Sequence, residues 1–594
     1  MEGSGRARTV KVVVLFALLI SFFLLFGVAT TKIALSDRKL PTLYTSSIES
    51  AIRGAIYSSD GFTLASSKKL YKAVMNTYNL DPGKKELFVT LFSTYSGIDK
   101  DELYDKLKRK GNIVLSYNID EKAAVNLKKL SYKLLRYGVF RDHEDESGRV
   151  FNYGLSIIES GEKREYTYKD TLEPVLGYVR KYEDSKITKV EGVKGLEKYY
   201  QYNLSPVQDM YVRGERDLGF DIILNGDSIV KRRIDGQNLH LNISLKLQKK
   251  IERVLDEFKK RLNAEEIVVG LMDSDSGKML AAATTNRFNP NKILTRDYPN
   301  LNSKMLEYPI EPGSVIKPII FSLLLEHRLV NPYENIFLED GRYRLGKNVI
   351  TDSHELGRAI AEDVIIYSSN IGMAKLSQRL SASNYHQGLL KFGFSQPSGI
   401  DLPYEKNGNI PPVTRLQNEV YKATVSYGYG FQATFMQMLK AFNIFNNAGN
   451  AISPKIGSYF NSRSSQKVYL TKSEPREVIS PATADIVNKM LQKTVNEGTG
   501  VGAKVPGLNI GGKTGTAHIA VAGKYEDIYN SSFFGFANGL ENKFTIGVMV
   551  YNLDSKGEYF ASRTAVPIFK SIIELLVDEG MLRRFVSKTP EGES

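Results

Sequence analysis

The sequence predicts an α/β protein that is anchored to a membrane by one N-terminal helix. Three observations carry this prediction. Residues 12–31 form a continuous, uncharged and strongly apolar stretch. Residues 32–235 mix short apolar runs with charged helical stretches, and from about residue 236 hairpin-like strands alternate with amphipathic helices. Strands and helices that intermix along one chain are typical of α/β and α+β architectures.

The composition is that of a globular chain without cysteine chemistry. Of its 594 residues, 42% are hydrophobic and 25% are charged, close to the average of folded proteins. The absence of cysteine excludes disulfides, thiolate zinc sites, iron–sulfur clusters and a cysteine nucleophile. The six histidines are scattered and form no His-Glu-x-x-His pair, so we expect no metal site and no cofactor.

The charge balance argues against a nucleic-acid partner. The chain carries 80 Lys and Arg against 66 Asp and Glu, a net charge of +14. Nucleic-acid binders concentrate basic residues on one face or arm, whereas here the excess is spread along the chain. A mild attraction to anionic surfaces, such as membrane headgroups or cell-wall polymer, is the expected consequence.

The apolar stretch at residues 12–31 is long enough to cross a bilayer as a helix, because a span needs about 20 residues. A cleaved signal peptide is the alternative, since Gly27-Val28-Ala29 resembles a small-x-small cleavage site. We favour a retained anchor, because the stretch exceeds the usual signal core of about 7–15 residues. Basic residues flank both ends, so orientation rests on the short basic head at residues 1–11, which is typical of a cytoplasmic end.

Beyond the anchor we predict two domains and a tail. Residues 32–235 are expected to be irregular α+β and to act as a spacer or docking module. Residues 236–586 form the second domain, and residues 587–594 a disordered tail. The predicted elements are helices at 100–110, 120–135, 245–262 and 566–576, strands at 238–244 and 545–551, and a hairpin over 265–284.

The first motif with catalytic potential is Ser-x-x-Lys, at Ser314 and Lys317. A Glu-Pro-Gly break precedes it and an apolar stretch follows, so we expect Ser314 at a helix N-terminus with Lys317 one turn along on the same face. A serine hydroxyl needs a base within reach, and a lysine can serve if burial and the helix end lower its pKa. Alone this pattern is weak, because it occurs by chance in most long chains.

The second motif is Tyr-Ser-Ser-Asn at residues 367–370, between stretches 358–366 and 371–380, which we expect to be helical. A polar break of this kind can present Ser368 and Asn370 to a cleft. Ser368 could relay a proton between a lysine and a leaving amine, and Asn370 could hold a substrate amide. When these residues are taken alone, a plain helix–helix turn with Ser and Asn caps is the better explanation.

The third motif is a glycine-flanked Lys-Thr-Gly-Thr segment at Lys513, Thr514, Gly515 and Thr516. Missing side chains in a β-leaning segment let another backbone approach, so an extended peptide could add to this edge. The lysine and the two hydroxyls would bind a carboxylate, and the amides of Ser314 and Thr516 could form an oxyanion hole. Residues 507–514 also match the Walker A pattern, which we reject because a β-leaning run follows instead of a helix.

The order Ser-x-x-Lys, Ser-x-Asn, Lys-Thr-Gly is specific even though each part is weak. With these motifs the sequence resembles the class B penicillin-binding proteins, bacterial peptidoglycan D,D-transpeptidases, over nearly the whole chain. Residues 235–248 look like the division-type (FtsI-like) members, and the elongation type is the alternative. The chain departs from the family at residues 57–61 and at His518, where relatives often carry Asp-Arg-Asn-Gly and Gln. Further family-like stretches are residues 53–56, 392–394, 399–403, 428–430 and 532–536.

The resemblance implies a pedestal of the dimerisation type followed by an antiparallel sheet flanked by helices, as in serine β-lactamases. It implies that Ser314 attacks the D-Ala-D-Ala end of a stem peptide, with Lys317 as base, Ser368 as relay and Asn370 as amide clamp. Residues 513–516 would bind the carboxylate, and β-lactams would acylate the same serine.

The resemblance also implies a place and partners for the protein. It implies an inner-membrane protein with a periplasmic catalytic domain. A glycosyltransferase and other division or elongation proteins are the expected partners, because no polymerising domain is evident at residues 32–235.

Two other classes share these motifs. A β-lactamase would need a group that activates the deacylating water, and class D enzymes usually carry a tryptophan beside the lysine, whereas this chain has none. A non-catalytic scaffold or β-lactam sensor is the other alternative. Rapid turnover of penicillin would favour the first class, and failure to bind penicillin covalently would favour the second.

Overall fold

The computed structural model of the protein describes residues 3–35, 44–144, 150–151, 154–184, 187–217, 222–353, 355, 357–461, 466–471, 473–521, 524–554 and 557–585. The chain divides into two compact units, one of residues 1–49 with 209–233 and one of residues 50–208 with 234–594. We predicted instead that residues 32–235 form one domain that ends before residue 236, and this boundary stays a prediction. The predicted tail at residues 587–594 lies outside the described residues.

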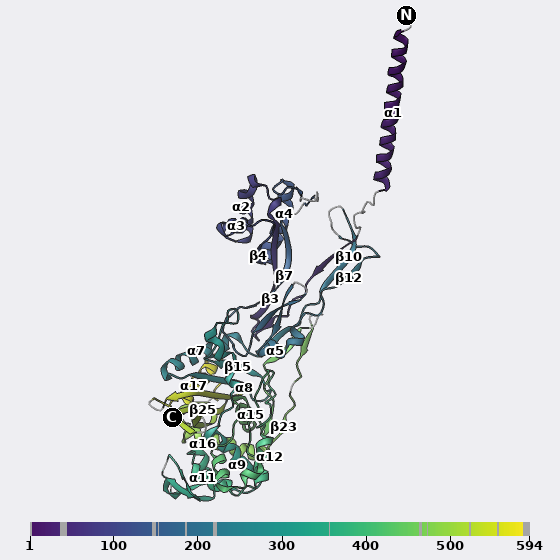
Figure 1. Ribbon diagram of the computed structural model, residues 1–594. Coiled ribbons are helices and arrows are strands. Elements are labelled where there is room, and N and C mark those ends of the chain that lie inside the picture. Colours follow the sequence, from purple (N-terminus) through teal and green to yellow (C-terminus); the bar gives the residue numbers. More distant parts are fainter. Residues whose placement is uncertain are drawn as a thin grey trace, which may run out of the picture. The chain divides into compact units, whose positions relative to one another are not determined.

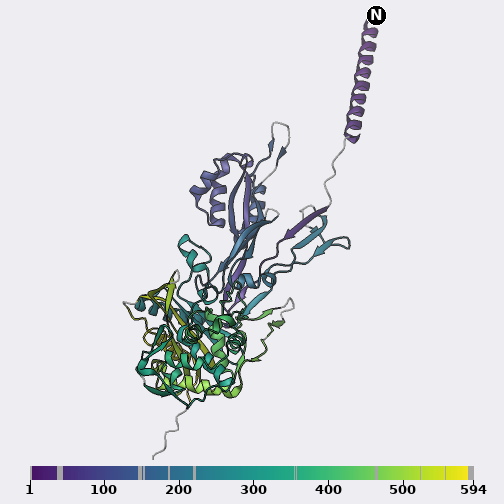
Figure 2. The same cartoon turned by 60° about the horizontal axis from the view of Figure 1, so that its bottom comes forward.

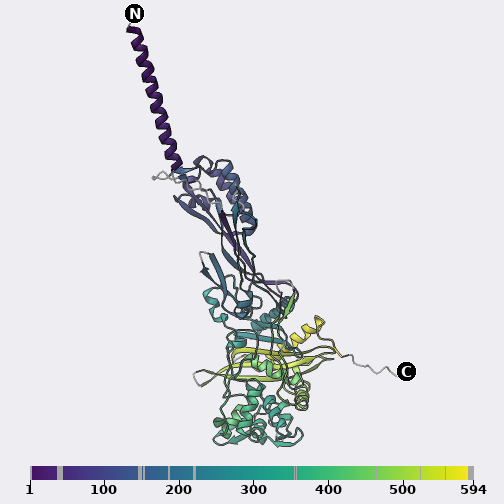
Figure 3. The same cartoon turned by 90° about the vertical axis from the view of Figure 1, so that its right-hand side faces the viewer.

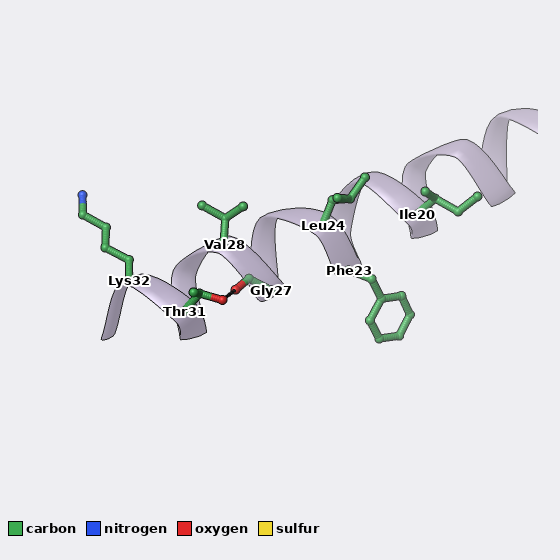
Figure 4. Close-up of a pocket in the computed structure, with 7 residues that line it drawn as sticks. All are labelled: Ile20, Phe23, Leu24, Gly27, Val28, Thr31 and Lys32. Carbon is green, nitrogen blue, oxygen red and sulfur yellow. Dashed lines mark hydrogen bonds between the residues drawn. The ribbon is translucent and has the colours of Figure 1, made fainter. Parts of the chain in front are cut away.

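The first unit begins with helix α1 (Gly3–Leu35), drawn in purple in Figure 1. Among the described residues, its segment Thr9–Leu35 is the one helix long and apolar enough to cross a membrane, with a mean hydropathy of 3.0. It contains the stretch predicted at residues 12–31 and indicates a single-pass anchor. Figure 4 shows the Thr31 hydroxyl turned back along the helix, where it donates a 2.6 Å hydrogen bond to the Gly27 carbonyl. This bond satisfies the hydroxyl without water.

The first unit also contains a small antiparallel sheet in which β10 is the central strand. Its strands are β1 (Tyr44–Glu49), β10 (Met210–Arg216), β11 (Ile222–Ile223) and β12 (Ile229–Lys231).

The second unit begins with a nine-stranded mixed sheet. Its order is β22-β21-β13-β2-β3-β7-β9-β8, and β4 pairs with β3 off this path. The long antiparallel strands β3 and β7 carry a small subdomain, in which helices α2, α3 and α4 pack on the sheet around their own apolar core (Figures 1 and 2). The bounds are β2 (Ile56–Tyr57), β3 (Thr63–Asn76), α2 (Lys85–Ser96), α3 (Lys100–Lys106), β4 (Asn112–Asp120), α4 (Glu121–Arg136), β7 (Ser156–Tyr166), β8 (Val179–Asp184), β9 (Ile187–Gly192), β13 (Asn238–Leu241), β21 (Gly457–Asn461) and β22 (Lys467–Tyr469).

The C-terminal part is built on a five-stranded antiparallel sheet of order β15-β14-β26-β25-β24. Helices α7 and α17 cover one face, and α15 packs on the other, so apolar side chains fill both faces. Figure 3 shows the yellow-green strands of this sheet between helices. The bounds are α7 (Leu245–Leu262), β14 (Glu266–Asp273), β15 (Met279–Thr284), α15 (Phe435–Asn446), β24 (Asn509–Val521), β25 (Lys524–Asn538), β26 (Lys543–Asp554) and α17 (Ala565–Asp578).

These elements confirm the predicted hairpin, the helices at 245–262 and 566–576, and the antiparallel sheet flanked by helices.

The label η marks short 3-10 helices. The remaining elements are η1 (Thr77–Asn79), η2 (Pro82–Lys84), β5 (His143–Glu144), β6 (Val150–Phe151), α5 (Gly195–Tyr199), α6 (Gln201–Leu204), η3 (Thr295–Leu301), α8 (Lys304–Glu307), η4 (Gly313–Ile316), α9 (Lys317–Glu326), β16 (Asn335–Phe337), η5 (Glu339–Gly341), β17 (Arg342–Leu345), β18 (Asn348–Thr351), β19 (Arg358–Ile360), α10 (Asp363–Ile366), α11 (Asn370–Ser377), α12 (Ala382–Lys391), α13 (Val413–Leu416), α14 (Glu419–Ser426), β20 (Asn450–Ala451), β23 (Arg476–Glu477), α16 (Pro481–Asn496) and η6 (Val501–Ala503).

One predicted element is wrong. We expected residues 358–366 to be helical, but Arg358–Ile360 forms strand β19 and only Asp363–Ile366 is helical. The strand forms because it pairs with β16. A partner more than twenty residues upstream in the sequence thus overrides the local helical pattern.

Candidate active site

The Ser-x-x-Lys motif lies where a short 3-10 helix, η4, runs into helix α9. In a 3-10 helix residues three apart eclipse one another, so Ser314 and Lys317 share one face. The Ser314 carbonyl accepts a hydrogen bond from the Lys317 amide instead of one from residue 318. Pro318 has no amide hydrogen to donate, but the Ser314 carbonyl does not need it, because Lys317 already supplies the hydrogen bond. The Lys317 side chain is fully buried, whereas Ser314 is only partly buried.

The Ser-x-Asn motif forms the turn between α10 and α11. Ser368 has a left-handed backbone with a φ of 63°, an uncommon conformation for a residue other than glycine. Ser369 caps α11, because its hydroxyl accepts a hydrogen bond from the Gly372 amide. Our alternative explanation of this motif is a helix cap, and Ser369 makes that cap. The side chains of Ser368 and Asn370 contact Lys317 instead.

These two motifs meet at the Lys317 ammonium nitrogen. Lys317 Nζ donates to the Ser368 carbonyl at 2.6 Å, to Ser368 Oγ at 3.2 Å and to Asn370 Oδ1 at 2.7 Å. Segments about fifty residues apart in the sequence are thus joined by direct hydrogen bonds.

The Lys-Thr-Gly motif lies on β24, the edge strand of the five-stranded sheet. A strand at this position agrees with the rejection of a phosphate-binding loop. The strand packs closely on η4: a Cβ atom added to Gly515 would lie 2.9 Å from Val315 Cγ1 and 3.3 Å from the Pro312 carbonyl oxygen. Only glycine allows this approach, which brings the motif beside Ser314. Lys513 is fully buried, and the Thr516 hydroxyl accepts a hydrogen bond from the Ala561 amide.

Burial controls the charge of both lysines. It lowers the pKa of Lys317 from 10.5 to about 7, although the negative charge of Asp352 opposes the shift. Burial also lowers the pKa of Lys513 well below its usual value, and the charge of Lys317 lowers it further. Lys317 is therefore close to half neutral at physiological pH, which is the state that a general base requires.

The structure adds residues to which the sequence motifs give no role. Gly428 has a φ of 99° and lies so close to the serine turn that an added Cβ would be 2.0 Å from the Gly313 carbonyl oxygen. The Gly313 amide donates to the Gly428 carbonyl at 3.0 Å. Thr499 pairs its hydroxyl with that of Thr514 at 2.9 Å. Residues 428–430 are one of the family-like stretches, but the sequence indicates neither contact.

The family comparison matches two segments of the chain. Residues 48–241 match the penicillin-binding protein dimerisation domain, and residues 267–574 match the penicillin-binding protein transpeptidase domain. The second match covers more than half of the chain and includes all three motifs.

Individual relatives are distant. Penicillin-binding protein PbpB of Mycobacterium tuberculosis is 28% identical over 354 residues, covering 57% of this chain and 52% of the relative. The peptidoglycan D,D-transpeptidase FtsI homolog of Mesostigma viride is 28% identical over 459 residues, covering 71% of this chain and 74% of the relative. This chain thus spans about half the length of the first relative.

A solved structure shares the fold. Penicillin-binding protein 3 of Mycobacterium tuberculosis, complexed with aztreonam, has a TM-score of 0.64 and 21% identity over 91% of this chain and 98% of that one.

The family assignment follows from the two matched domains, and the motifs and the sheet with its flanking helices agree with it. The chain belongs to the penicillin-binding-protein transpeptidase family, with a class B arrangement of a dimerisation domain before the transpeptidase domain.

Proposed function

We propose that the protein is a serine-type peptidoglycan D,D-transpeptidase. The observation that carries this proposal is the position of Lys317. Its buried amine, with a pKa of about 7, shares a helical turn with Ser314 and bonds both functional residues of the Ser-x-Asn motif. A partly neutral amine in this place can take the proton of the serine hydroxyl at physiological pH.

In the first half-reaction, Ser314 Oγ attacks the carbonyl carbon of the penultimate D-alanine of a stem peptide, and Lys317 takes the hydroxyl proton. The backbone amides of Ser314 and Thr516 stabilise the oxyanion of the tetrahedral intermediate. The peptide bond then breaks. The terminal D-alanine leaves as an amine after a proton returns from Lys317 through the Ser368 hydroxyl, and an ester on Ser314 remains.

In the second half-reaction, an amine of a neighbouring stem peptide attacks this ester and gives a proton to Lys317. The ester bond breaks, Ser314 recovers its proton, and the new peptide bond is the crosslink. The Ser314 proton thus leaves on D-alanine and is replaced by a proton from the acceptor amine, so Ser314 and Lys317 regain their starting protonation states and no cofactor is consumed.

Substrate binding uses the edge of the sheet. The stem peptide adds to strand β24 as an extended strand, with its terminal carboxylate at Lys513, Thr514 and Thr516. The Thr516 hydroxyl accepts from the Ala561 amide, so its own proton remains available to a carboxylate oxygen. Asn370 uses one acceptor and one donor position internally, on Lys317 and on the Thr351 carbonyl, and keeps one of each for a substrate amide.

β-Lactams are expected to acylate Ser314 by the same route. The related Mycobacterium tuberculosis structure contains aztreonam, which supports extending β-lactam binding to this chain. The FtsI name of a relative that covers 71% of this chain supports a role in septal wall synthesis. We place the transpeptidase domain on the periplasmic side of the inner membrane, with α1 as its anchor and a glycosyltransferase of the division machinery as its partner.

Fluorescent penicillin tests this proposal. The full-length wild type should form a stable covalent adduct, and Ser314→Ala should form none while keeping the wild-type circular dichroism. Ser322→Ala, a change of a serine in helix α9, which follows η4 directly, is the matched control and should still label. Labelling of Ser314→Ala would refute the nucleophile, rapid release of the label would indicate a β-lactamase, and an unlabelled wild type would indicate a non-catalytic protein. In growing cells a midcell band supports septal synthesis, whereas patches along the sidewall would support the elongation type.

A further inference from the structure

A carboxylate outside the three motifs holds the Ser-x-Asn turn in place. Asp352 follows directly after strand β18, and its backbone amide donates to the Gly341 carbonyl at 3.1 Å. Its side chain accepts hydrogen bonds from Ser369 Oγ at 2.5 Å, the Asn370 amide at 2.6 Å and the Ile371 amide at 3.1 Å. One carboxylate therefore binds three consecutive residues at the start of helix α11.

These bonds supply the helix start with the partners it lacks. The first amides of a helix have no carbonyl within the helix to bond. Asp352 accepts from two of them, and the Ser369 hydroxyl accepts from a third, that of Gly372, while donating to Asp352. The negative charge also lies at the positive end of the helix, where it is stabilising. The turn that carries Ser368 is thus fixed from the α11 side.

The same chain segment orients the Asn370 side chain. The Thr351 carbonyl accepts from Asn370 Nδ2 at 3.0 Å, which fixes the amide with Oδ1 directed at Lys317 Nζ. Asn370 is therefore held at its backbone by Asp352 and at its side chain by Thr351.

Asp352 is also the carboxylate whose charge acts on Lys317. Within the part of the chain that the structure describes, two groups interact electrostatically with this amine: Asp352, which favours its protonated form, and the buried Lys513. Both lysines are fully buried, so a proton on Lys317 places a positive charge in the interior, where a nearby negative charge stabilises it.

We propose that Asp352 is a positioning residue of the active site, which holds Ser368 and Asn370 against Lys317 and supplies the counter-charge for that amine. The inference rests on the proposed acyl transfer at Ser314. Asp352 does not touch the reacting atoms, and it acts through the helix start and through the charge of Lys317.

The test is the pH dependence of acylation by fluorescent penicillin, measured as a second-order rate between pH 5 and 9 on the full chain in detergent. The wild-type rate should fall below a pH of about 7 as Lys317 becomes protonated. In Asp352→Asn the loss of the negative charge lowers the pKa of Lys317, so the acid limb should move to lower pH. The maximal rate should fall about 10- to 100-fold, because the turn is less well held.

Ser369→Ala is the matched control. It removes the hydroxyl that bonds Asp352 and Gly372 but leaves the charge, so it should lower the maximal rate without moving the acid limb. If Asp352→Asn does not fold, Asp352→Ser, which keeps an oxygen acceptor, takes its place. An acid limb at the wild-type pH in the uncharged variant would overturn the proposal. An unreactive wild type would instead refute the proposed function.

Discussion

Replacing Lys317 with methionine tests the central electrostatic feature of the site. The substitution keeps a long unbranched side chain and removes the amine. We expect Lys317→Met to lose penicillin labelling, because no base remains beside Ser314. We also expect its stability to depend on pH differently from that of the wild type, because the buried amine binds its proton much less tightly in the folded chain than in the unfolded one.

The sign and size follow from the two pKa values of Lys317, about 7 when folded and 10.5 as its ordinary value. Between these values the unfolded chain holds a proton that the folded chain has released, so this side chain makes stability rise with pH. Its destabilising effect is largest below pH 7, at about 5 kcal/mol, and disappears towards pH 10.5. From pH 7 to pH 9 the wild type should therefore gain about 2 kcal/mol that the methionine variant does not gain.

The absolute stability of the variant also reflects lost hydrogen bonds. Removing the amine leaves the Ser368 carbonyl and Asn370 Oδ1 without their donor, which costs about 1–3 kcal/mol for each group. This loss is the same at both pH values and cancels from the comparison. The removal also relieves Lys513 of a neighbouring charge, which changes the pH dependence in the same direction.

The assay is urea unfolding of the full-length proteins in detergent at pH 7 and pH 9, followed by far-ultraviolet circular dichroism. Lys504→Met, which removes an exposed lysine of the same domain, is the control and should follow the wild type at both pH values. An equal difference between Lys317→Met and the wild type at pH 7 and pH 9 would refute the conclusion that burial lowers the pKa of this amine in the folded protein.

Two further predictions address residues away from the reacting atoms. Gly428→Ala should reduce the acylation rate at least about tenfold with little change in secondary structure, because a Cβ there would displace the Gly313 carbonyl and with it the Ser314 turn; an unchanged rate would contradict this contact. Glu197→Gln should lower the free energy of unfolding by about 3–5 kcal/mol, because it removes the buried counter-charge of Arg53 and Arg164; a melting temperature within one degree of the wild type would refute this.

Much of the fold and most of the candidate site could be predicted from local sequence. Helices at residues 245–262 and 566–576 follow from apolar residues at helical spacing, and the hairpin over 265–284 from two apolar runs around a Ser-Gly turn. The three motifs could be found because each is short and contiguous. Their chemistry constrains residue type and spacing within a few positions, so the signal survives in the linear sequence.

The sequence by itself determined the membrane-spanning stretch, the order of the motifs and the family, because these depend on composition and on residues close together in the chain. Only the tertiary structure decided the strand at residues 358–360, the contact of Gly428 with the serine turn and the place of Asp352 beneath the Ser-x-Asn turn. The physical reason is that pairing, burial and charge act between atoms that are close in space. The pKa of Lys317 and the hydrogen bonds of Asp352 depend on neighbours that the chain brings together only when it folds.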